Sequence, residues 1–241
     1  MNELTGGHTV HAFSDELSNL SKLVLKQGGL GRDQLRRAVQ TLRDEDPKAA
    51  GHVIDRDREM NDLDMQVDDE IVRVIAKRQP VARDLRDIMV VQKTIVDLER
   101  VGDEARKVAN LTIHLFDVDK SPPNGQLLRD IFSMAEDVDG MLEKAMSAFE
   151  TQDVELALEV IKDDDELYEE FRSSLRRLST YLMEDARCVG QVVDIVLVLR
   201  ALERIGGHAK NIGGYVIYLV TGKNLRHAAP ETIEATLRTP D

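Results

Sequence analysis

Glu99 and Asp103 are two carboxylates four residues apart in the stretch DLERVGDEARKVAN, residues 97–110. On a helix they would lie about 40° apart, where two like charges cost an isolated helix roughly 0.2–0.5 kcal/mol. Asp57 and Asn61 repeat this spacing earlier in the chain. If the two segments are antiparallel neighbours, four oxygen ligands converge, and hard divalent or trivalent cations require such a set. The spacing therefore predicts a metal site; the alternative is a chance pairing that an acidic chain tolerates.

The stretch around Glu99 is present twice. The second copy, ALERIGGHAKNIGG, begins at Ala201, and five of thirteen positions are identical between residues 97–109 and 201–213. A second pair of segments, HVIDRDREMNDL and EVIKDDDELYEE, repeats at a displacement of 107 residues. The glycine and alanine positions of the repeat share one helical face, where they allow a neighbouring helix to approach closely. We therefore expect two related halves that use these small residues for helix packing.

Apolar residues recur at helical spacing almost throughout, and no stretch alternates convincingly with a period of two. The low aromatic content of 4%, with many Leu, Ala, Glu and Arg residues, also suits long amphipathic helices. Six helical segments are expected, at residues 14–43, 47–77, 81–116, 126–150, 153–185 and 189–220, with N-caps at Asp46 and Asp153 and a terminating Gly222. Because short connections make neighbouring helices antiparallel, the predicted fold class is all-α, with two tandem, sequence-related antiparallel three-helix bundles.

The clearest boundary is DVDKSPPNG, which contains two prolines and an Asn-Gly pair but no apolar periodicity. Such a composition marks a loop. The expected organisation is a flexible N-terminus at 1–13, a first bundle at 14–117, a linker at 118–125, a second bundle at 126–222 and a C-terminal tail at 223–241 with one short helix.

Several classes of function are disfavoured. The net charge of −13 argues against direct nucleic acid binding, and without strands there is no Gly-rich nucleotide loop. Six scattered histidines and one cysteine form no zinc ligand set, and no nucleophile–base–acid arrangement indicates an enzyme. The N-terminus lacks the pattern of a secretory signal, and no apolar run is long enough to span a membrane. We therefore expect a soluble, cytoplasmic, non-enzymatic protein that reaches a membrane only through a partner.

LERVGDEA and LERIGGHA resemble the twice-repeated LERIGDHA signature of the PhoU family, and AKRQPVARDLR resembles its inter-helix turn. YLMEDARCV and YVIYLVTGKNLRH resemble segments of its second half, so the resemblance spans residues 14–227. It implies a cytoplasmic regulator of phosphate homeostasis, peripheral to the inner membrane through its partners. Those partners would be the ATPase subunit PstB of the high-affinity phosphate ABC transporter and the phosphate-sensing histidine kinase PhoR. Such a regulator represses the phosphate-starvation response and restrains uptake when phosphate is plentiful, and the resemblance also implies a homodimer.

Some members of the PhoU family bind multinuclear clusters of iron or other metals through paired acidic motifs, one pair in each bundle. By position, the resemblance implies ligands at Asp57, Asn61, Glu99 and Asp103 in the first bundle and at Asp164, Tyr168, Glu203 and Gly207 in the second. Tyr168 and Gly207 are not acids, although His208 could add a nitrogen ligand. We therefore expect the first bundle to bind a metal ion, whether iron, zinc, magnesium or manganese, better than the second.

Two alternatives to a regulatory adaptor remain open. One is a metal-binding helical protein that senses or stores iron or another divalent cation with paired carboxylates on neighbouring helices. Di-iron bundles of that kind carry a Glu-x-x-His motif, and none occurs in this sequence. The other is a scaffold whose acidic face recruits basic partner surfaces, which would keep its partner affinity after complete metal removal.

Overall fold

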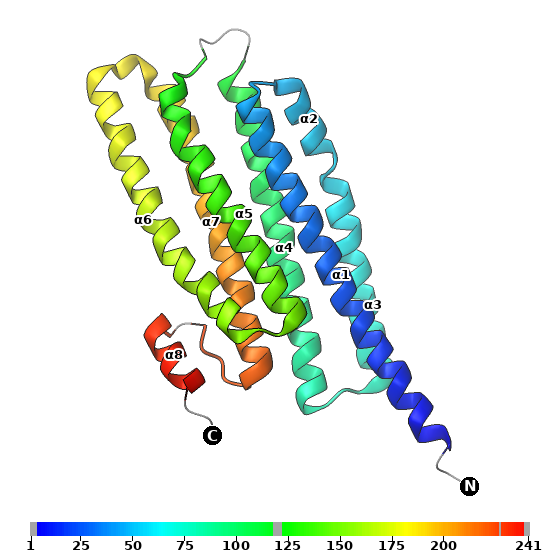
Figure 1. Cartoon of the computed structure of the whole chain (residues 1–241). Helices are drawn as coiled ribbons and strands as arrows, with labels where there is room; N and C mark the ends of the chain where they lie inside the picture. The colour runs from blue at the N-terminus through cyan, green and yellow to red at the C-terminus, as the bar shows by residue number, and fades with distance from the viewer. Residues whose placement is uncertain (1–3, 118–121, 227, 239–241) are drawn as a thin grey trace.

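The computed structural model describes residues 4–117, 122–226 and 228–238, and for residues 4–12 and Asp57 it describes the backbone only. All regular structure in these ranges is helical (Figure 1). The elements are α1 (Leu4–Arg43), α2 (Pro47–Asp55), α3 (Asp57–Arg78), α4 (Ala82–Leu115), α5 (Gly125–Thr151), α6 (Val154–Glu184), the 3-10 turn η1 (Ala186–Cys188), α7 (Val189–Thr221) and α8 (Pro230–Arg238). The all-α prediction is confirmed, α8 is the short helix expected in the tail, and the predicted linker lies partly outside the described residues.

Two helix boundaries differ from the sequence-based expectation. α1 begins at Leu4 rather than at Ser14, so residues 4–13, expected to be flexible, are part of the helix. The second segment is not one helix, because it is interrupted at Arg56 between α2 and α3. There the carbonyl of Arg56 accepts a hydrogen bond from the N–H of Glu59, three residues on, at 3.1 Å. The regular four-residue pattern is lost locally, a change that apolar spacing does not reveal.

The turns that open the second helical segment of each half have the same local structure. Asp46 and Asp153 both cap a helix, since each carboxylate accepts hydrogen bonds from the backbone N–H groups two and three residues later. The residue before each cap, Glu45 or Gln152, is left-handed, with φ of 54° and 55° respectively. Both predicted N-caps are thus confirmed, and the repeat seen in the sequence extends to backbone conformation.

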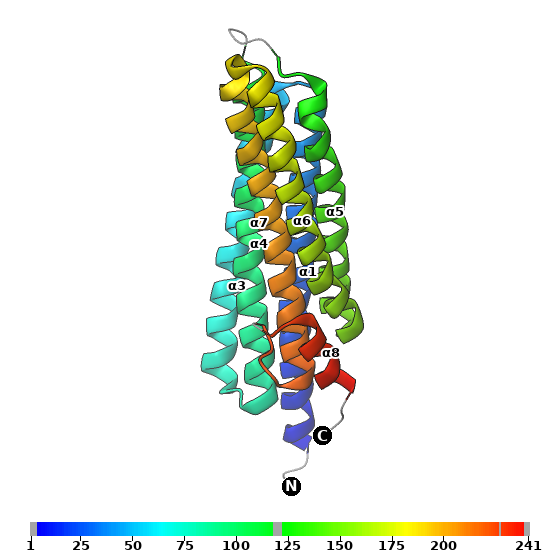
Figure 2. The same ribbon diagram turned by 90° about the vertical axis from the view of Figure 1, so that its left-hand side faces the viewer.

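The two central helices, α4 and α7, run antiparallel and side by side (Figures 1 and 2). α1 packs on α4 and α5 packs on α7, in front of them in Figure 1, while α2 and α3 flank α4 and α6 flanks α7. Each half is therefore a three-helix bundle in which α2 and α3 together count as one helix. Buried apolar side chains from both halves form one continuous cluster. The repeated stretch consequently lies where the two halves meet.

Small residues in the repeated stretch serve packing, as predicted. A Cβ atom built at Gly102 would lie 3.2 Å from Met60 in α3 and 3.3 Å from Gln34 in α1. In the second half, a Cβ atom at Gly206 would overlap Leu167 in α6. Each of these glycines lets the long side chain of the neighbouring helix lie directly on the backbone. The same three-helix contact is therefore made once in each half.

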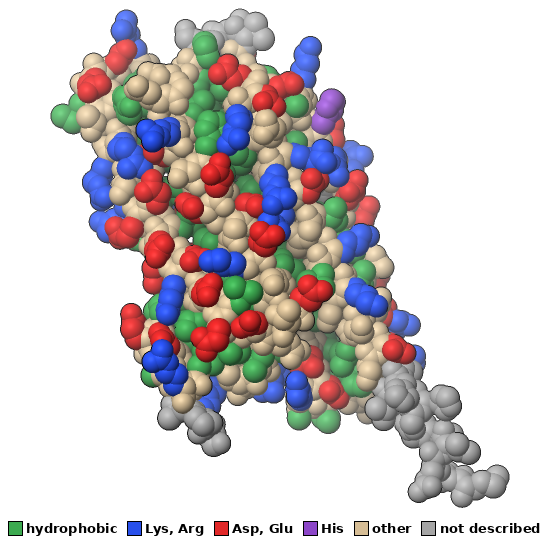
Figure 3. Space-filling view, viewed as in Figure 1, with side chains coloured by type: hydrophobic (Ala, Val, Ile, Leu, Met, Phe, Trp, Pro, Cys, Tyr) green, Lys and Arg blue, Asp and Glu red, His purple; other side chains and the backbone are tan. Residues whose placement is uncertain are grey.

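The face formed by α1, α5 and α6 carries interspersed charges of both signs (Figure 3). Between α1 and α5, the guanidinium groups of Arg32 and Arg36 both donate to the carboxylate of Asp139, with Nε–Oδ1 distances of 3.1 and 2.9 Å. These ion pairs lie on the outer side of the α1–α5 junction, whereas Met146 of α5 packs on Gly28 of α1 further inside. None of the described helices combines the length and the apolar character that a transmembrane span requires.

Glu16 joins the first half of α1 to the end of α3. Its carboxylate accepts a hydrogen bond from Arg78 at 2.7 Å and another from Lys77 at 2.9 Å. These hydrogen bonds lower the pKa of Glu16 to about 2. The stabilisation they give is fully present above the unfolded-state pKa of 4.5 and is lost as the pH falls through about 2. We expect Glu16→Gln to lower the Tm at pH 7 by about 1–4 °C, the scale of a partly exposed ion pair.

Thermal unfolding followed by circular dichroism from pH 7 to pH 2 checks this prediction. The difference from the parent protein should shrink as the pH falls below 4.5. Asp15→Asn, at an exposed position of the same helix, is the control and should leave the Tm nearly unchanged. An equal loss in both variants would contradict the role of Glu16.

Candidate functional site

The two copies of the repeated stretch lie on α4 and α7 and contact each other across the junction of the halves. Near the middle of the contact, Arg204 of α7 lies 3.2 Å from the carboxylate of Glu104 in α4. Glu104 is only 3% exposed, and its second cationic partner is Lys107 at 2.9 Å. The cationic groups of Arg204 and Lys107 are about half exposed, so they offset the cost of burying the carboxylate of Glu104 without being buried themselves.

A second buried carboxylate, Asp97, lies in the same junction and is 5% exposed. Its Oδ2 accepts a hydrogen bond from the Tyr215 hydroxyl at 2.8 Å, and its Oδ1 accepts from the Asn211 amide at 3.1 Å. The Nδ1 atom of His208 is 2.7 Å from the same Oδ1. His208, Asn211 and Tyr215 are spaced by three and four residues along α7, so they project from one face. Three side chains of the second half thus satisfy one carboxylate of the first.

Tyr215 is the most deeply buried of these partners, with 6% of its surface exposed. Burial, together with the hydrogen bond to Asp97, raises the pKa of Tyr215 to about 12. The phenol therefore stays protonated and continues to donate to Asp97 well above neutral pH. Because the folded-state pKa lies above the unfolded value of 10.0, this contribution is fully present below pH 10 and is lost as the pH rises through about 12.

Sequence analysis did not identify Asp97 as part of a cluster and treated His208 as a candidate metal ligand. A signal was present in the repeat, because Asp97 aligns with Ala201 and Glu104 aligns with His208. Because α4 and α7 are antiparallel, the position of Asp97 in α4 faces the position of His208 in α7. The two places where the copies differ therefore supply the two members of one polar contact. Ala201, which occupies the position of Asp97 in the second copy, has an apolar side chain and needs no polar partner. Divergence between the copies therefore builds the polar contact between the halves.

The predicted ligands of the first bundle are only partly accounted for. Glu99 and Asp103 are partly buried on α4, and Asp103 accepts a hydrogen bond from Arg106 at 2.6 Å. Asn61 is exposed on α3, and the side chain of Asp57 lies outside the described residues. The contact of Met60 with Gly102 places this part of α3 against this part of α4. The two segments are neighbours, as the metal prediction requires.

The predicted ligands of the second bundle are engaged in other contacts. Lys210 donates to Asp164 at 2.7 Å, and His208 lies against Asp97 rather than against Asp164. Glu203 is 3.0 Å from Arg200. Burial raises the pKa of Glu203, Arg200 opposes the rise, and the charge of Asp164 adds to it. The charge of Asp164 in α6 therefore acts on Glu203 in α7, while the ammonium group of Lys210 pairs with Asp164.

Across the described residues, no group of three or more His, Cys, Asp or Glu side chains is arranged to hold a metal ion. In the second-bundle set, Lys210 already pairs with one carboxylate oxygen of Asp164, so metal binding there stays a prediction of a weaker site. For the first bundle, iron, zinc, magnesium or manganese binding stays a prediction, since it depends on Asp57. Tyr168, which belongs to the second set by position, is exposed and supplies no acid.

Metal analysis of purified protein tests the predicted asymmetry. We expect a variant with both Glu99→Ala and Asp103→Ala to lose most of any bound metal, because it removes half of the first oxygen set. Glu203→Ala should leave the metal content unchanged. The measurement is elemental analysis by plasma mass spectrometry after growth and dialysis in iron, zinc, magnesium or manganese. Equal losses from the two variants would contradict the asymmetry.

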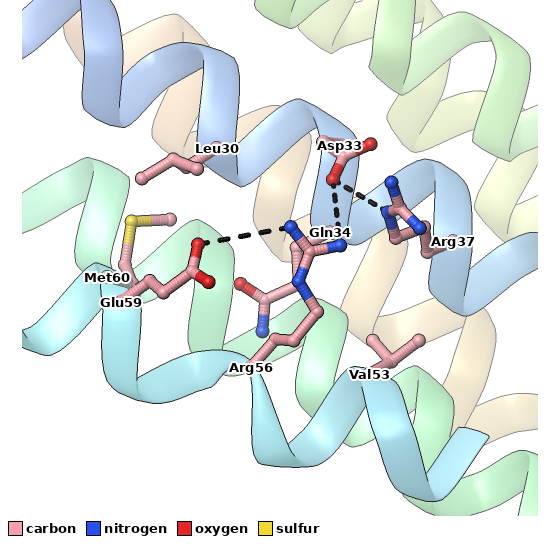
Figure 4. Close-up of a pocket in the computed structure, with 8 residues that line it drawn as sticks. All are labelled: Leu30, Asp33, Gln34, Arg37, Val53, Arg56, Glu59 and Met60. Carbon is pink, nitrogen blue, oxygen red and sulfur yellow. Dashed lines mark hydrogen bonds and ion pairs between the residues drawn. The ribbon is translucent and has the colours of Figure 1, made fainter. Parts of the chain in front are cut away.

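A small pocket lies between α1, α2 and α3 beside the interruption at Arg56 (Figure 4). Asp33 accepts from Arg37 at 2.7 Å and from Arg56 at 3.4 Å, and Glu59 is 3.9 Å from Arg56. The volume of about 20 Å³ is the space of roughly one water molecule. The charged side chains here pair with one another across the interruption, and the pocket is too small for an organic ligand.

Comparison with protein families gives two matches to one model, the PhoU domain, at residues 24–112 and 131–216. One match falls in each half of the fold, and each includes one copy of the repeated stretch. The family model therefore covers well over half of the chain.

Two proteins of similar sequence are named as accessory proteins of a phosphate-specific transport system. The phosphate-specific transport system accessory protein PhoU homolog of Pseudomonas aeruginosa is 42% identical over 220 residues, which cover 91% of this chain and 90% of that protein. The phosphate-specific transport system accessory protein PhoU of Escherichia coli is 33% identical over 234 residues, which cover 97% and 95%.

Two crystal structures resemble the fold. PhoU from Pseudomonas aeruginosa superposes with a TM-score of 0.81 at 41% identity, covering 88% of this chain and 100% of that one. The phosphate transport system regulatory protein PhoU from Streptococcus pneumoniae gives 0.79 at 22% identity, covering 88% and 98%. At that identity the second likeness concerns the fold alone.

Proposed function

This chain belongs to the PhoU family, and from that premise we propose that it is a regulatory accessory protein of a phosphate-specific transport system. The observation that carries the proposal is the likeness to the Pseudomonas aeruginosa accessory protein, 42% identical over 91% of the chain. The α4–α7 junction adds support, because the family signature occurs once on each of these helices and its small residues make the helix contacts described above.

In the proposed role, the protein acts in the cytoplasm without catalysing a reaction. It contacts the ATPase subunit PstB of the phosphate ABC transporter and the histidine kinase PhoR, and it reaches the inner membrane only through them. When phosphate is plentiful it represses the phosphate-starvation response and restrains uptake. A homodimer presenting two copies of the elongated bundle pair is the proposed assembly.

Deletion of the gene tests the regulatory role. We expect a phosphate-starvation reporter to become active in phosphate-rich medium when the gene is deleted, because the repressing adaptor is lost. Expression of the intact chain from a plasmid should restore repression. A reporter that stays silent in the deletion strain would show that the proposal is wrong.

The named partners require a separate measurement. Purified full-length protein should bind PstB and the cytoplasmic portion of PhoR in surface plasmon resonance, with and without a metal chelator. Binding that survives complete metal removal would favour a metal-independent scaffold over a metal-dependent adaptor. Absence of binding to both proteins would overturn the proposed partners while leaving the genetic test of regulation intact.

A further inference from the structure

A pocket of about 360 Å³ lies where the two halves meet at one end of the bundle. Its walls come from α1 and α4 of the first half and from α5, the turn after α5 and α7 of the second. Much of the lining is apolar: Leu17, Leu25, Val90, Val91, Phe149 and Leu219. A pocket of this size and character suits a small organic molecule.

The charged groups that line the pocket are Asp87, Glu150 and Lys22. Two carboxylates and one ammonium give the lining a formal charge of −1. Ser18 and Ser21 of α1 add hydroxyl groups. Beyond the lining, Arg83, Asp84 and Arg86 act on Asp87 from its own helix. The lining is therefore half apolar and half polar, with a surplus negative charge.

Asp87 is half-buried and differs from the buried carboxylate of Asp97. Its Oδ1 atom is shielded from solvent and has no hydrogen-bond partner among the described residues. Asp97, by contrast, has three side-chain partners. Burial raises the pKa of Asp87, and the charges of Arg83 and Arg86 only oppose that rise. A shielded carboxylate oxygen without a donor is costly, and the carboxylate that carries it lines the pocket, where an ammonium group can pair with its charge.

We propose that this pocket binds a small organic cation, in which an ammonium group is attached to an apolar body. The ammonium group donates to Asp87, and the body packs against Leu25, Val90 and Phe149. Because the walls come from both halves, the occupant also stabilises their junction. This site is separate from the carboxylates of the metal prediction and does not depend on the proposed regulatory function.

Titration of ¹⁵N-labelled full-length protein with 2-phenylethylammonium tests the site, with neutral 2-phenylethanol as the matched probe. We expect amide shifts confined to residues 17–25, 87–91, 149–152 and the neighbourhood of Leu219. The ammonium probe should bind at least about tenfold more tightly than the alcohol, because only it forms a charge-assisted hydrogen bond. Equal affinities, or no shifts at 20 mM (roughly the weakest affinity expected for a fragment), would overturn the proposal.

Two variants with one control locate the binding. Asp87→Asn should weaken the ammonium probe at least about tenfold and leave the alcohol unchanged, because it removes the charge and keeps the shape. Asp15→Asn, at an exposed position of α1 outside the pocket lining, should bind both probes as the parent does. Ser18→Phe, at an exposed position on the rim, should block both probes. If Asp87→Asn does not fold, undiminished binding by Ser18→Phe overturns the site.

Discussion

Replacing Asp97 with alanine is expected to lower the free energy of unfolding by about 2–4 kcal/mol, because it removes the acceptor of the buried Tyr215 hydroxyl and of two further side chains. The carboxylate is 5% exposed and is held by His208, Asn211 and Tyr215. For a chain of this length the loss corresponds to a fall in Tm of roughly 5–15 °C. Asp97 joins the halves, so the loss should affect the whole fold rather than one helix.

Urea unfolding followed by circular dichroism measures this effect. Asp103→Ala is the matched control, because it removes the same group from the same helix at a position where the side chain is 37% exposed and paired with Arg106. The control should cost no more than about 1 kcal/mol. Adding Tyr215→Phe to Asp97→Ala should cost little more, since the two groups share one hydrogen bond. Equal costs for Asp97→Ala and Asp103→Ala would contradict the assignment.

Gly213→Ala is expected to destabilise the second half by about 1–3 kcal/mol, because a Cβ atom there forces two helices apart. The added atom would lie 2.9 Å from the backbone carbonyl oxygen of Ala157 in α6. A backbone atom cannot rotate away as the end of a flexible side chain can. The cost of separating α6 from α7 should therefore exceed the gain in helix propensity that alanine brings.

Gly207→Ala is the matched comparison, since it is the same substitution on the same helix. A Cβ atom at Gly207 would meet nothing within 4 Å. This variant should gain about 0.5–1 kcal/mol from helix propensity alone. The two variants should thus shift the urea midpoint in opposite directions. A stabilising Gly213→Ala would show that α6 and α7 do not approach as closely as the structure indicates.

Signals that act within a few residues allowed the helical elements to be predicted. Asp46 and Asp153 cap the helices that follow them, because a side-chain oxygen needs only the N–H groups of the next turn. Gly102 and Gly206 lie on helix contacts, because the 3.6-residue period sets which positions share a face. The all-α class follows from the same 3.6-residue period, and the repeat and the family resemblance can be recognised by comparing stretches of sequence directly. The interruption at Arg56 escaped prediction because it changes one hydrogen bond without changing the apolar period.

The contacts between helices could not be read in this way. Asp97 meets His208 only because α4 and α7 are antiparallel at one particular register, and Lys210 reaches Asp164 only because α7 has one particular rotation against α6. Register and rotation result from packing the whole shared core, to which all the long helices contribute. A pair of carboxylates at helical spacing can therefore be recognised in the sequence. The partner of each carboxylate depends on which face of the neighbouring helix lies against it in the folded protein. At Asp97 that face holds three partners, whereas at Asp87 no described side chain donates to the shielded oxygen.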